Sequence, residues 1–593
     1  MDNRRLLVAA LLSMAVLFFW QIAFPPPEPP VRTAAAPIAA PGALVDSPST
    51  PESTQPPAVA VSADGGVATA LPATKLEPIA ATAEERVVLE NELLRAEFSN
   101  RGAQLLSLGL KSKLDLDGSP LELVQRRGET PHPFALVDSA SAPVPADLQL
   151  FAVARDAGVE PEVHFHYRGD GGEVEKRFRL RGDGRLDFEV VVRGPAAGWG
   201  VLLGPGVRNT SKEELESRFL RRSAVWFTAG EVETLDAGDG NETLRLPGAA
   251  LSWVGLEDTY FLTAAIPEAG LGEARLEPVR LVGVVGNGGR VDALPLVPGV
   301  EATAEQKKLP VDLRLVLVAA GERLAGTTFW GAKQYDRLES FPWGLEQTVR
   351  WGWLGFLARP LLRALQWIQA NLVTNYGWAI VLLTVALKMV LLPLSIASFK
   401  SMRKMQKLAP KMQAIRERYR PKLRDKQGRF NADVQRQMNE EIMGLYRTEG
   451  VNPAGGCLPI LVQLPIFFAF YQLLSTAVEL WRSPWVLWVH DLTAPDPYWV
   501  LPIVMGITQF IQTKMTPPPP DPVQKRLIQA MPIVFTVFSL GFPSGLVVYW
   551  LTNNVLSIAQ QGLYNRIRER AEAREREAEG QAAGGAKRGK KRS

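Results

Sequence analysis

Residues 380–392 read Ile-Val-Leu-Leu-Thr-Val-Ala-Leu-Lys-Met-Val-Leu-Leu, an apolar run that contains one lysine, Lys388. The run lies within residues 375–395, a stretch long enough to cross a bilayer core as a helix. With Lys400 at the expected cytoplasmic edge, a rise of about 1.5 Å per residue places Lys388 roughly 18 Å deep. A charge at that depth costs about 2.5 to 3.5 kcal/mol on insertion scales, so the ammonium should face water or a partner inside a helix bundle. No acidic residue lies inside the other apolar segments, which favours a wet cavity over a structural ion pair.

Further apolar segments mark a membrane protein. After residue 341, the candidates to span are residues 375–395, 457–477, 498–513 and 528–551. An earlier segment, residues 6–24, has 19 residues without a charge and follows Arg4 and Arg5. It is longer than the apolar core of a typical signal peptide, and no small-residue cleavage site precedes Pro25. We therefore expect an uncleaved anchor.

The distribution of charge predicts how these segments are oriented. Residues 399–452 carry 14 Lys and Arg against 6 Asp and Glu, and residues 566–593 carry 10 against 5. The positive-inside tendency places both segments in the cytoplasm, together with the N-terminus, which requires an even number of spans. A helix-breaking turn at Pro543-Ser-Gly545 makes the number of spans even, because it divides the last apolar segment into two spans. The prediction is a polytopic α-helical membrane protein with six transmembrane helices.

Residues 84–330 follow the pattern of an all-β domain. Val174–Leu180 alternate in polarity, a Gly182-Asp-Gly184 turn follows, and Leu186–Val192 alternate again. This is typical of a β-hairpin with one buried face. Repeated short strands with glycine-rich turns predict a sheet sandwich, which the topology places in the periplasm.

The chain thus divides into successive parts. They are a transmembrane anchor at 1–24, a disordered Pro/Ala-rich linker at 25–83, the β domain at 84–330, a connecting segment with an interfacial amphipathic helix at 331–372, a core of five transmembrane helices at 373–565 that includes a cytoplasmic helical hairpin at 399–452, and a basic cytoplasmic tail at 566–593. The interfacial helix is expected because Arg359 and Arg363 share one face while leucines occupy the other. The charge of the tail suits ribosomal RNA and anionic lipid equally.

The hairpin carries apolar side chains at helical spacing on both arms. They are Met405, Leu408, Met412, Ile415 and Tyr419 on the first arm and Val434, Met438, Ile442 and Leu445 on the second. We expect them to pack the two helices together rather than to offer an adaptable methionine surface to apolar segments of other proteins.

Polar residues inside the apolar segments suggest a hydrophilic groove around Lys388. Thr384 lies one turn before Lys388 on the same face. In the last segment Asn553 and Gln560 share a face, as do Asn554 and Gln561. Each such residue alone is typical of contacts between helices, but together with the lysine they predict a groove. The predicted groove residues are Lys388, Thr384, Gln463, Tyr549, Trp550, Asn554 and Gln560.

The composition argues against several other classes of function. Over 593 residues, 66 Lys and Arg against 62 Asp and Glu leave a net charge of +4, which does not suit a generally basic nucleic-acid binder. Cys457 is the one cysteine, so an intramolecular disulfide is excluded. His164 and His166 share a strand face without a third ligand nearby, which makes a weak metal site. We find no nucleotide loop and no nucleophile with a base, and we expect no metal, no cofactor and no enzymatic reaction.

Residues 331–561 resemble the YidC family of membrane protein insertases, in the form found in Gram-negative bacteria. The matching stretches are Gly331-Ala-Lys-Gln-Tyr-Asp336, the Lys388 segment ending at Pro393, Val451-Asn-Pro-Ala-Gly-Gly-Cys-Leu-Pro459, Gln463-Leu-Pro-Ile-Phe467, Asp496-Pro-Tyr498, Met531-Pro532, Phe542-Pro-Ser-Gly-Leu546, Asn554 and Gln560-Gln561. Their order and spacing are highly specific. Upstream the resemblance is weaker and includes Asn100-Arg-Gly-Ala103.

The resemblance implies an insertase and chaperone of the bacterial inner membrane. Such a protein inserts integral membrane proteins and helps them to fold, alone or with the Sec translocon. It has nascent membrane proteins, the ribosome and membrane lipids as partners, and no small-molecule substrate. The family also implies a periplasmic β-supersandwich similar to sugar-binding mutarotase-like folds. In the family an arginine draws the proteins to be inserted into a groove open to the cytoplasm and to lipid. Here the aligned residue is Lys388, which keeps the charge but lacks the bidentate fork of arginine.

Two other functions remain open from the residues. A secondary transporter could use Lys388 as a coupling charge, although repeated halves with broken helices, which would be expected, are not detected. A carbohydrate-active protein tethered to the membrane would need an acid/base pair in the β domain.

Overall fold

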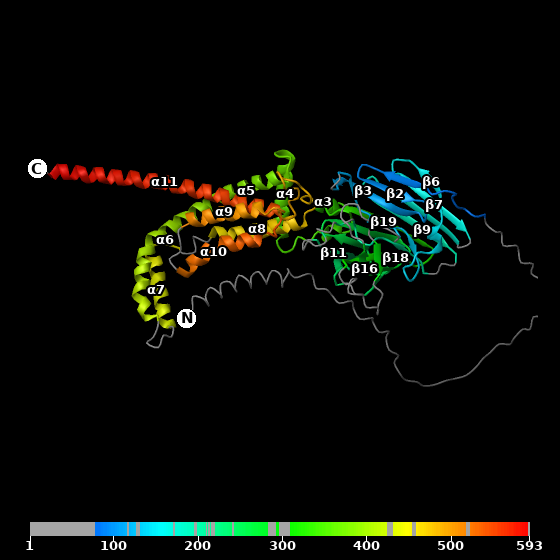
Figure 1. The fold of residues 1–593 in the computed structure, drawn as a ribbon, viewed down its shortest axis with the longest axis horizontal. Coiled ribbons are helices and arrows are strands. Elements are labelled where there is room, and N and C mark those ends of the chain that lie inside the picture. Colours follow the sequence, from blue (N-terminus) through cyan, green and yellow to red (C-terminus); the bar gives the residue numbers. More distant parts are fainter. Residues whose placement is uncertain are drawn as a thin grey trace, which may run out of the picture.

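The computed structural model describes residues 77–590, apart from gaps at 116–117, 126–130, 170–171, 195–197, 209, 211–213, 215–219, 240–241, 283–291, 296–308, 424–430, 453–457 and 517–521. The predicted N-terminal anchor, most of the predicted linker and Cys457 lie outside the described residues. Strands gather at one end of the molecule and long helices at the other, and the last helix extends away from both (Figure 1).

The β domain consists of antiparallel strands. They are β1 Arg86–Glu90, β2 Leu94–Ser99, β3 Gln104–Leu114, β4 Pro120–Glu122, β5 Leu136–Val137, β6 Ala152–Asp156, β7 Glu162–Gly169, β8 Gly172–Leu180, β9 Arg185–Arg193, β10 Gly200–Leu202, β11 Arg222–Thr228, β12 Glu231–Asp236, β13 Leu244–Pro247, β14 Trp253–Asp258, β15 Phe261–Ala269, β16 Leu271–Val282, β17 Asp292–Pro295, β18 Val311–Ala319 and β19 Arg323–Ala332. A nine-stranded sheet has the order β12-β11-β14-β15-β19-β9-β8-β7-β6, a six-stranded sheet runs β13-β16-β18-β10-β5 with β17 beside β16, and a four-stranded sheet runs β1-β2-β3-β4.

The predicted hairpin between residues 174 and 192 is confirmed. Strands β8 and β9 pair antiparallel, with Phe178 opposite Phe188, and the turn contains Gly184 at a φ of +82°, where glycine avoids the strain of a Cβ. Side chains of β8 alternate between the surface and the core as expected. Lys176 departs from the pattern of apolar core residues, because its side chain points into the core and is fully buried.

The helical part follows the β domain in the chain. Its helices are α3 Tyr335–Glu339, α4 Gly355–Asn371, α5 Tyr376–Val390, α6 Leu392–Tyr419, α7 Ala432–Thr448, α8 Leu458–Thr476, α9 Val500–Met515, α10 Pro522–Ser539 and α11 Ser544–Lys590. Among the described residues, no single helix combines the length and the apolarity of a membrane span. Helices α4 and α5 reach that combination only as a pair, which bends by 117°.

The segment 375–395, which the sequence predicts as one helix, is divided. Helix α5 ends at Val390, and α6 begins at Leu392 with Pro393 in its first turn. Proline has no N–H for the helix hydrogen bond and its ring clashes with the preceding turn, whereas the first turn of a new helix accommodates it. The helical hairpin of α6 and α7 therefore starts from a helix that begins four residues after Lys388.

The predicted break at Pro543-Ser-Gly545 is confirmed. Helix α10 ends at Ser539 and α11 begins at Ser544. The backbone N–H of Ser544 donates to the carbonyl of Ala494, and that of Gly545 donates to the carbonyl of Leu492, both at 2.8 Å. The first N–H groups of α11, which have no partner within the helix, are thus satisfied by the α8–α9 loop.

Helix α4 packs its leucines against protein. Leu361 and Leu365 are buried in a core shared with α5 and α8. The opposite face is not purely polar, because Phe356 and Trp367 are 74% and 60% exposed beside the exposed Arg359. The aromatic side chains, not the leucines, are therefore the apolar groups that this helix offers to its surroundings.

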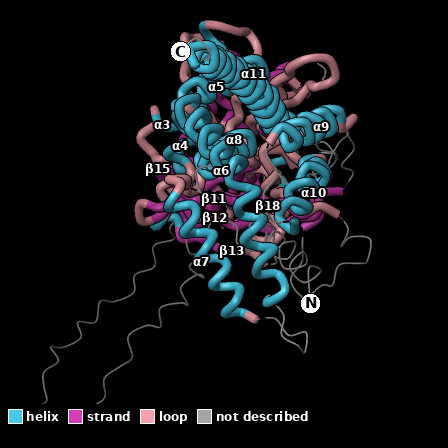
Figure 2. Tube along the Cα trace, turned by 90° about the vertical axis from the view of Figure 1, so that its left-hand side faces the viewer, coloured by secondary structure: helices cyan, strands magenta, loops and turns pink. Residues whose placement is uncertain are grey.

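The predicted packing of the hairpin is confirmed. Leu408 and Met412 of α6 form a buried cluster with Met438 and Ile442 of α7. The two helices run alongside each other away from the remaining helices (Figure 2). The methionines are packed between the two helices of the hairpin, as expected for an apolar stripe on each helix.

The α8–α9 loop, residues 477–499, fits into the β domain. Trp481 is 3% exposed and belongs to the core of the β domain. Its ring lies edge-on to Phe261 at 5.0 Å, and the guanidinium of Arg208 lies 5.0 Å from the Trp481 ring and 5.3 Å from the Phe261 ring. Because Phe261 comes from the middle of the nine-stranded sheet, the loop and the sheet share one hydrophobic core.

Polar contacts surround this apolar contact. Arg482 pairs with Asp115 at 2.8 Å, and the ammonium of Lys113 donates to the carbonyl of Val478 at 2.8 Å. Burial raises the pKa of Glu479 and of Asp491 in the same loop, as expected where water is excluded from carboxyl groups. The contact between the two parts of the chain is therefore buried at its centre, where Trp481 lies.

Candidate functional site

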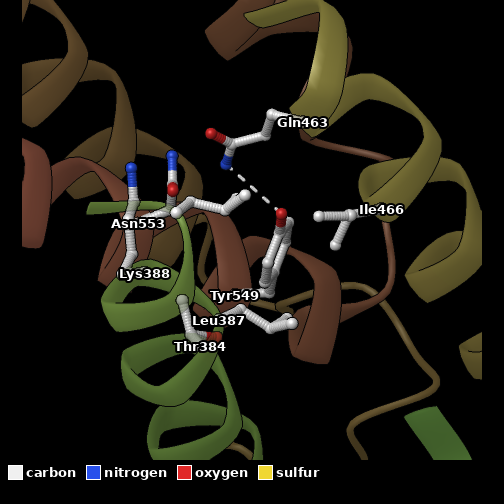
Figure 3. A pocket seen from close by; sticks show the side chains of 8 residues that line it. Thr384, Leu387, Lys388, Gln463, Ile466, Tyr549 and Asn553 are labelled. Atoms are coloured by element: carbon white, nitrogen blue, oxygen red, sulfur yellow. Dashed lines mark hydrogen bonds between the residues drawn. The ribbon is translucent and has the colours of Figure 1, made fainter. Parts of the chain in front are cut away.

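Helices α5, α8 and α11 enclose a pocket around Lys388. The lining side chains are Thr384, Leu387 and Lys388 from α5, Leu391 between α5 and α6, Gln463 and Ile466 from α8, and Tyr549 and Asn553 from α11. Its volume is about 10 Å³, which is room for about one water molecule. Polar groups from three helices therefore face one hollow, with a few apolar side chains between them (Figure 3).

Lys388 has a neutral partner. Its Nζ donates to Oγ of Ser557 at 2.8 Å. Within the part of the chain that the structure describes, no ion pair joins Lys388 to a carboxylate. The side chain is half-buried, so a positive charge at the pocket wall is left without a counter-charge.

The other polar groups of the pocket are tied to the helices. The Thr384 hydroxyl donates to the carbonyl of Ile380 at 2.7 Å. Gln463 donates from Nε2 to the Tyr549 hydroxyl at 3.2 Å, and the Tyr549 ring stacks on Phe470 at 4.4 Å. These bonds fix the polar wall opposite Lys388.

The structure brings together only part of the predicted groove. Lys388, Thr384, Gln463 and Tyr549 meet in the pocket. Trp550 instead donates to Gln509 of α9 at 3.0 Å.

Two more of the predicted groove residues lie away from the pocket. Asn554 faces α9, where it donates to Thr508 at 3.3 Å, and Gln560 is not among the lining residues. A helix turns by about 100° per residue, so neighbours in sequence such as Asn553 and Asn554 face different helices. Asn553 therefore lines the pocket, and Asn554 contacts α9.

The predicted groove lacks two polar residues of this region: Asn553, which lines the pocket, and Ser557, which accepts the hydrogen bond from Lys388. They follow Tyr549 at intervals of four residues, the spacing of one helix face. The sequence predicts that these residues share one face of α11. It does not predict that this face is the one near Lys388.

The outer face of β7 and β8 contains a cluster of possible metal ligands. His166, Glu173 and Glu175 offer atoms within 4.8 Å of one another. Arg193 donates to Glu175 at 2.8 Å, and Arg168 donates to Glu173. The expectation that no third ligand lies near the two histidines is therefore wrong, because β8 brings Glu173 and Glu175 beside His166. The arginines offset the charges of these carboxylates.

Comparison with known proteins identifies relatives of both parts of the chain. The family model described as "YidC periplasmic domain" matches residues 86–364, and the one described as "60Kd inner membrane protein" matches residues 367–572. A protein of Cupriavidus necator named "Membrane protein insertase YidC" is 35% identical over 536 residues, which cover 86% of this chain and 87% of that protein. A protein of the same name from Methylobacillus flagellatus is 32% identical over 602 residues, covering 97% and 99%.

A solved structure described as "Active YidC insertase crystal structure with the first transmembrane domain resolved" aligns at 19% identity. The alignment covers 82% of this chain and 94% of that one, with a TM-score of 0.34. The family relationship rests on the sequence matches.

Proposed function

The chain belongs to the YidC family of membrane protein insertases, and from this premise we propose how it handles a client, meaning a membrane protein to be inserted. The proposal is that an acidic polar segment of the client enters the pocket beside Lys388 while the client's apolar helix moves into lipid. Insertion of membrane proteins, and not catalysis of a chemical reaction, is the function of the chain, which has an inner-membrane part and a periplasmic β domain.

The proposed topology has six spans. They are residues 6–24, α5, α8, α9, α10 and the first turns of α11. Both termini and the α6–α7 hairpin are in the cytoplasm. The excess of Lys and Arg in residues 399–452 and 566–593 supports this orientation.

Short helices support a thinned bilayer around the pocket. Helices α5, α9, α10 and α8 have 15, 16, 18 and 19 residues, which correspond to lengths of about 22 to 28 Å. A typical hydrocarbon core is about 30 Å thick. A bilayer thins around short spans, and a thinner barrier shortens the path of a polar segment.

The uncompensated ammonium is the single observation that carries the mechanism. Lys388 is hydrogen-bonded to a neutral hydroxyl, so its charge remains available to a carboxylate of the client. Attraction between the charges draws the acidic segment into the pocket. The client's helix is then stabilised in lipid by about 25 cal/mol for each Å² of apolar surface removed from water. No nucleotide takes part in these steps.

Replacement of Lys388 tests this proposal. We expect Lys388→Ala to lower the insertion of clients with acidic tails by about 5- to 150-fold, the range that corresponds to a coupling of about 1 to 3 kcal/mol. Lys388→Arg should retain insertion because it keeps the charge. The measurement is insertion into proteoliposomes of one client whose tail carries either Asp or Asn. Equal insertion of the Asp client by wild-type protein and Lys388→Ala would refute the proposal.

Additional partners are proposed on the basis of charge and family. The tail from Arg566 onward, with 10 Lys and Arg against 5 Asp and Glu, offers a basic surface to ribosomal RNA or anionic lipid. The Sec translocon is a proposed partner for clients with several spans. A transporter function would predict solute uptake into vesicles that contain the purified chain, and uptake above that of empty vesicles would favour it.

A further inference from the structure

One face of α11 presents three polar side chains to the region between α5 and α8. Tyr549, Asn553 and Ser557 lie four residues apart, so they form a stripe along the helix. Tyr549 and Asn553 line the pocket, and Ser557 receives the hydrogen bond from Lys388. The stripe thus continues the polar wall to the ammonium itself.

The Ser557 hydroxyl is oriented by its own helix. It donates its one proton to the carbonyl of Asn553 at 2.7 Å. A hydroxyl has a single donor and two lone pairs, so toward Lys388 it acts as an acceptor only. Ser557 is 8% exposed, which leaves little room for water to replace it. The Ser557 oxygen can therefore accept a hydrogen bond from the ammonium, and its own proton does not point at the ammonium.

We propose that Ser557 is a positioning residue that holds the Lys388 ammonium at the pocket wall without neutralising it. A carboxylate at this position would cancel the charge. An apolar side chain would leave the long lysine stem free to extend toward the nearer interface, as buried lysines do. The serine hydroxyl avoids both outcomes and keeps an unpaired charge where an acidic client segment enters. This inference rests on the proposed function.

The test compares the preference of each variant for acidic clients. The readout is the ratio of insertion of the Asp-tailed client to that of the Asn-tailed client in proteoliposomes of the full chain. We expect Ser557→Ala to lower this ratio by about tenfold, because a hydrogen bond to a charged group is lost. Ser557→Thr should restore it, since threonine keeps the hydroxyl. Ser557→Asp should bring the ratio down to that of Lys388→Ala by pairing with the lysine internally.

Ser475→Ala is the matched control. Ser475 makes the same bond within its helix, to the carbonyl of Tyr471 at 2.8 Å, but on α8, where no bond to Lys388 is found. The ratio of Asp-client to Asn-client insertion by Ser475→Ala should equal that of the wild type. If Ser557→Ala reduces both clients equally, or if Ser557→Thr fails to restore the ratio, Ser557 has a merely structural role and the inference is wrong.

The lysine variants separate this inference from the proposed function. In a Lys388→Ala background, Ser557→Ala should change the ratio no further, because the group that it positions is absent. If Lys388→Ala leaves the ratio unchanged, the proposed function and this inference both fail. If Lys388→Ala lowers the ratio and Ser557→Ala does not, only the role of Ser557 fails.

Discussion

Lys176 shows how a single buried charge organises the β domain. It occupies a core position of β8, where its ammonium donates to the carbonyl of Phe134 at 2.7 Å and pairs with Asp147 at 3.2 Å. Burial raises the pKa of Asp147 and lowers the pKa of Lys176, because a dry core disfavours both charges. The ammonium also donates to the carbonyl of Gly102, in the Asn100–Ala103 turn that resembles the family. Gly102 has a φ of +66°, and a Cβ there would lie 2.1 Å from the carbonyl of Asp147.

Loss of the Lys176 ammonium should destabilise the β domain. In Lys176→Met, Asp147 and the two carbonyls lose their buried donor, and we expect the free energy of unfolding to fall by about 3 kcal/mol. The measurement is proteolysis of the full chain across a urea series, followed on fragments of the β domain. Arg86→Met is the control, because the Arg86 side chain is 69% exposed in its pair with Glu97 and should contribute less than about 1 kcal/mol. Equal urea midpoints for the two variants would contradict this prediction.

At the residue scale, periodicity predicts which side chains share a face but not what that face meets. The sequence correctly places Thr384 on the same side of α5 as Lys388, because both belong to one helix. The choice of Asn554 over Asn553 depends on the rotation of α11 against α5 and α9, and no local pattern reports that rotation. Lys176 was unexpected for a similar reason. Its partner Asp147 lies 29 residues away in a short 3-10 helix, Pro145–Leu148.

The junction between α10 and α11 depends on a close approach of backbones. A Cβ at Gly545 would lie 2.7 Å from Leu474 Cδ2 and 3.1 Å from the carbonyl oxygen of Leu492. Leu492 accepts the N–H of Gly545, so the two chains cannot separate without loss of that bond. A glycine at this position lets α11 start against α8 and the α8–α9 loop.

Gly545→Ala should therefore weaken the helical part. We expect a loss of about 1 to 3 kcal/mol, the usual cost of an extra carbon in a packed core, seen as a lower thermal unfolding midpoint of the full chain in detergent. Gly541→Ala is the matched control, because a Cβ there meets no atom within 4 Å. If both variants unfold at the same temperature, close packing does not explain the glycine.

Local sequence signals predict the helices and their breaks unequally well. The Pro-Ser-Gly break was predicted because proline, serine and glycine all act on the backbone within a few residues. The division of the 375–395 segment at Leu391 was missed, although Pro393 carried the signal, because the apolar run continues on both sides of it. The leucines of α4 suggested a lipid-facing surface, and only the packed structure distinguishes burial in protein from burial in lipid.

Across the whole molecule, Trp481 joins the helical part to the β domain. We expect Trp481→Ala to open this contact, since loss of a buried tryptophan costs about 3 to 5 kcal/mol. Hydrogen exchange in β15, which contains Phe261, and in residues 478–492 should become faster. Trp499→Ala in the same loop is the control, because Trp499 is 56% exposed and its removal should leave exchange unchanged. Unchanged protection in Trp481→Ala would show that the parts are held together elsewhere.

The two-part architecture could be predicted from hydropathy and alternation, but the contact between the parts could not. Phe261 and Trp481 are far apart in sequence, and each is an ordinary aromatic residue in its own segment. Their meeting depends on the completed sheet and the completed α8–α9 loop. The same applies to Arg208, whose guanidinium is buried beside Trp481 only once both parts have folded.

The bond between Lys388 and Ser557 also has a consequence for turnover. An insertase releases every passenger, meaning the protein that it inserts, to the lipid. Tight binding in the pocket would therefore slow turnover, because the passenger would stay bound for too long. In the proposed mechanism one ammonium holds the passenger only weakly, and the Ser557 hydroxyl keeps its hydrogen bond to that ammonium when the passenger departs. Under that proposal, release leaves Lys388 with its hydrogen-bond partner, and the passenger's own affinity for the bilayer sets the pace of each cycle.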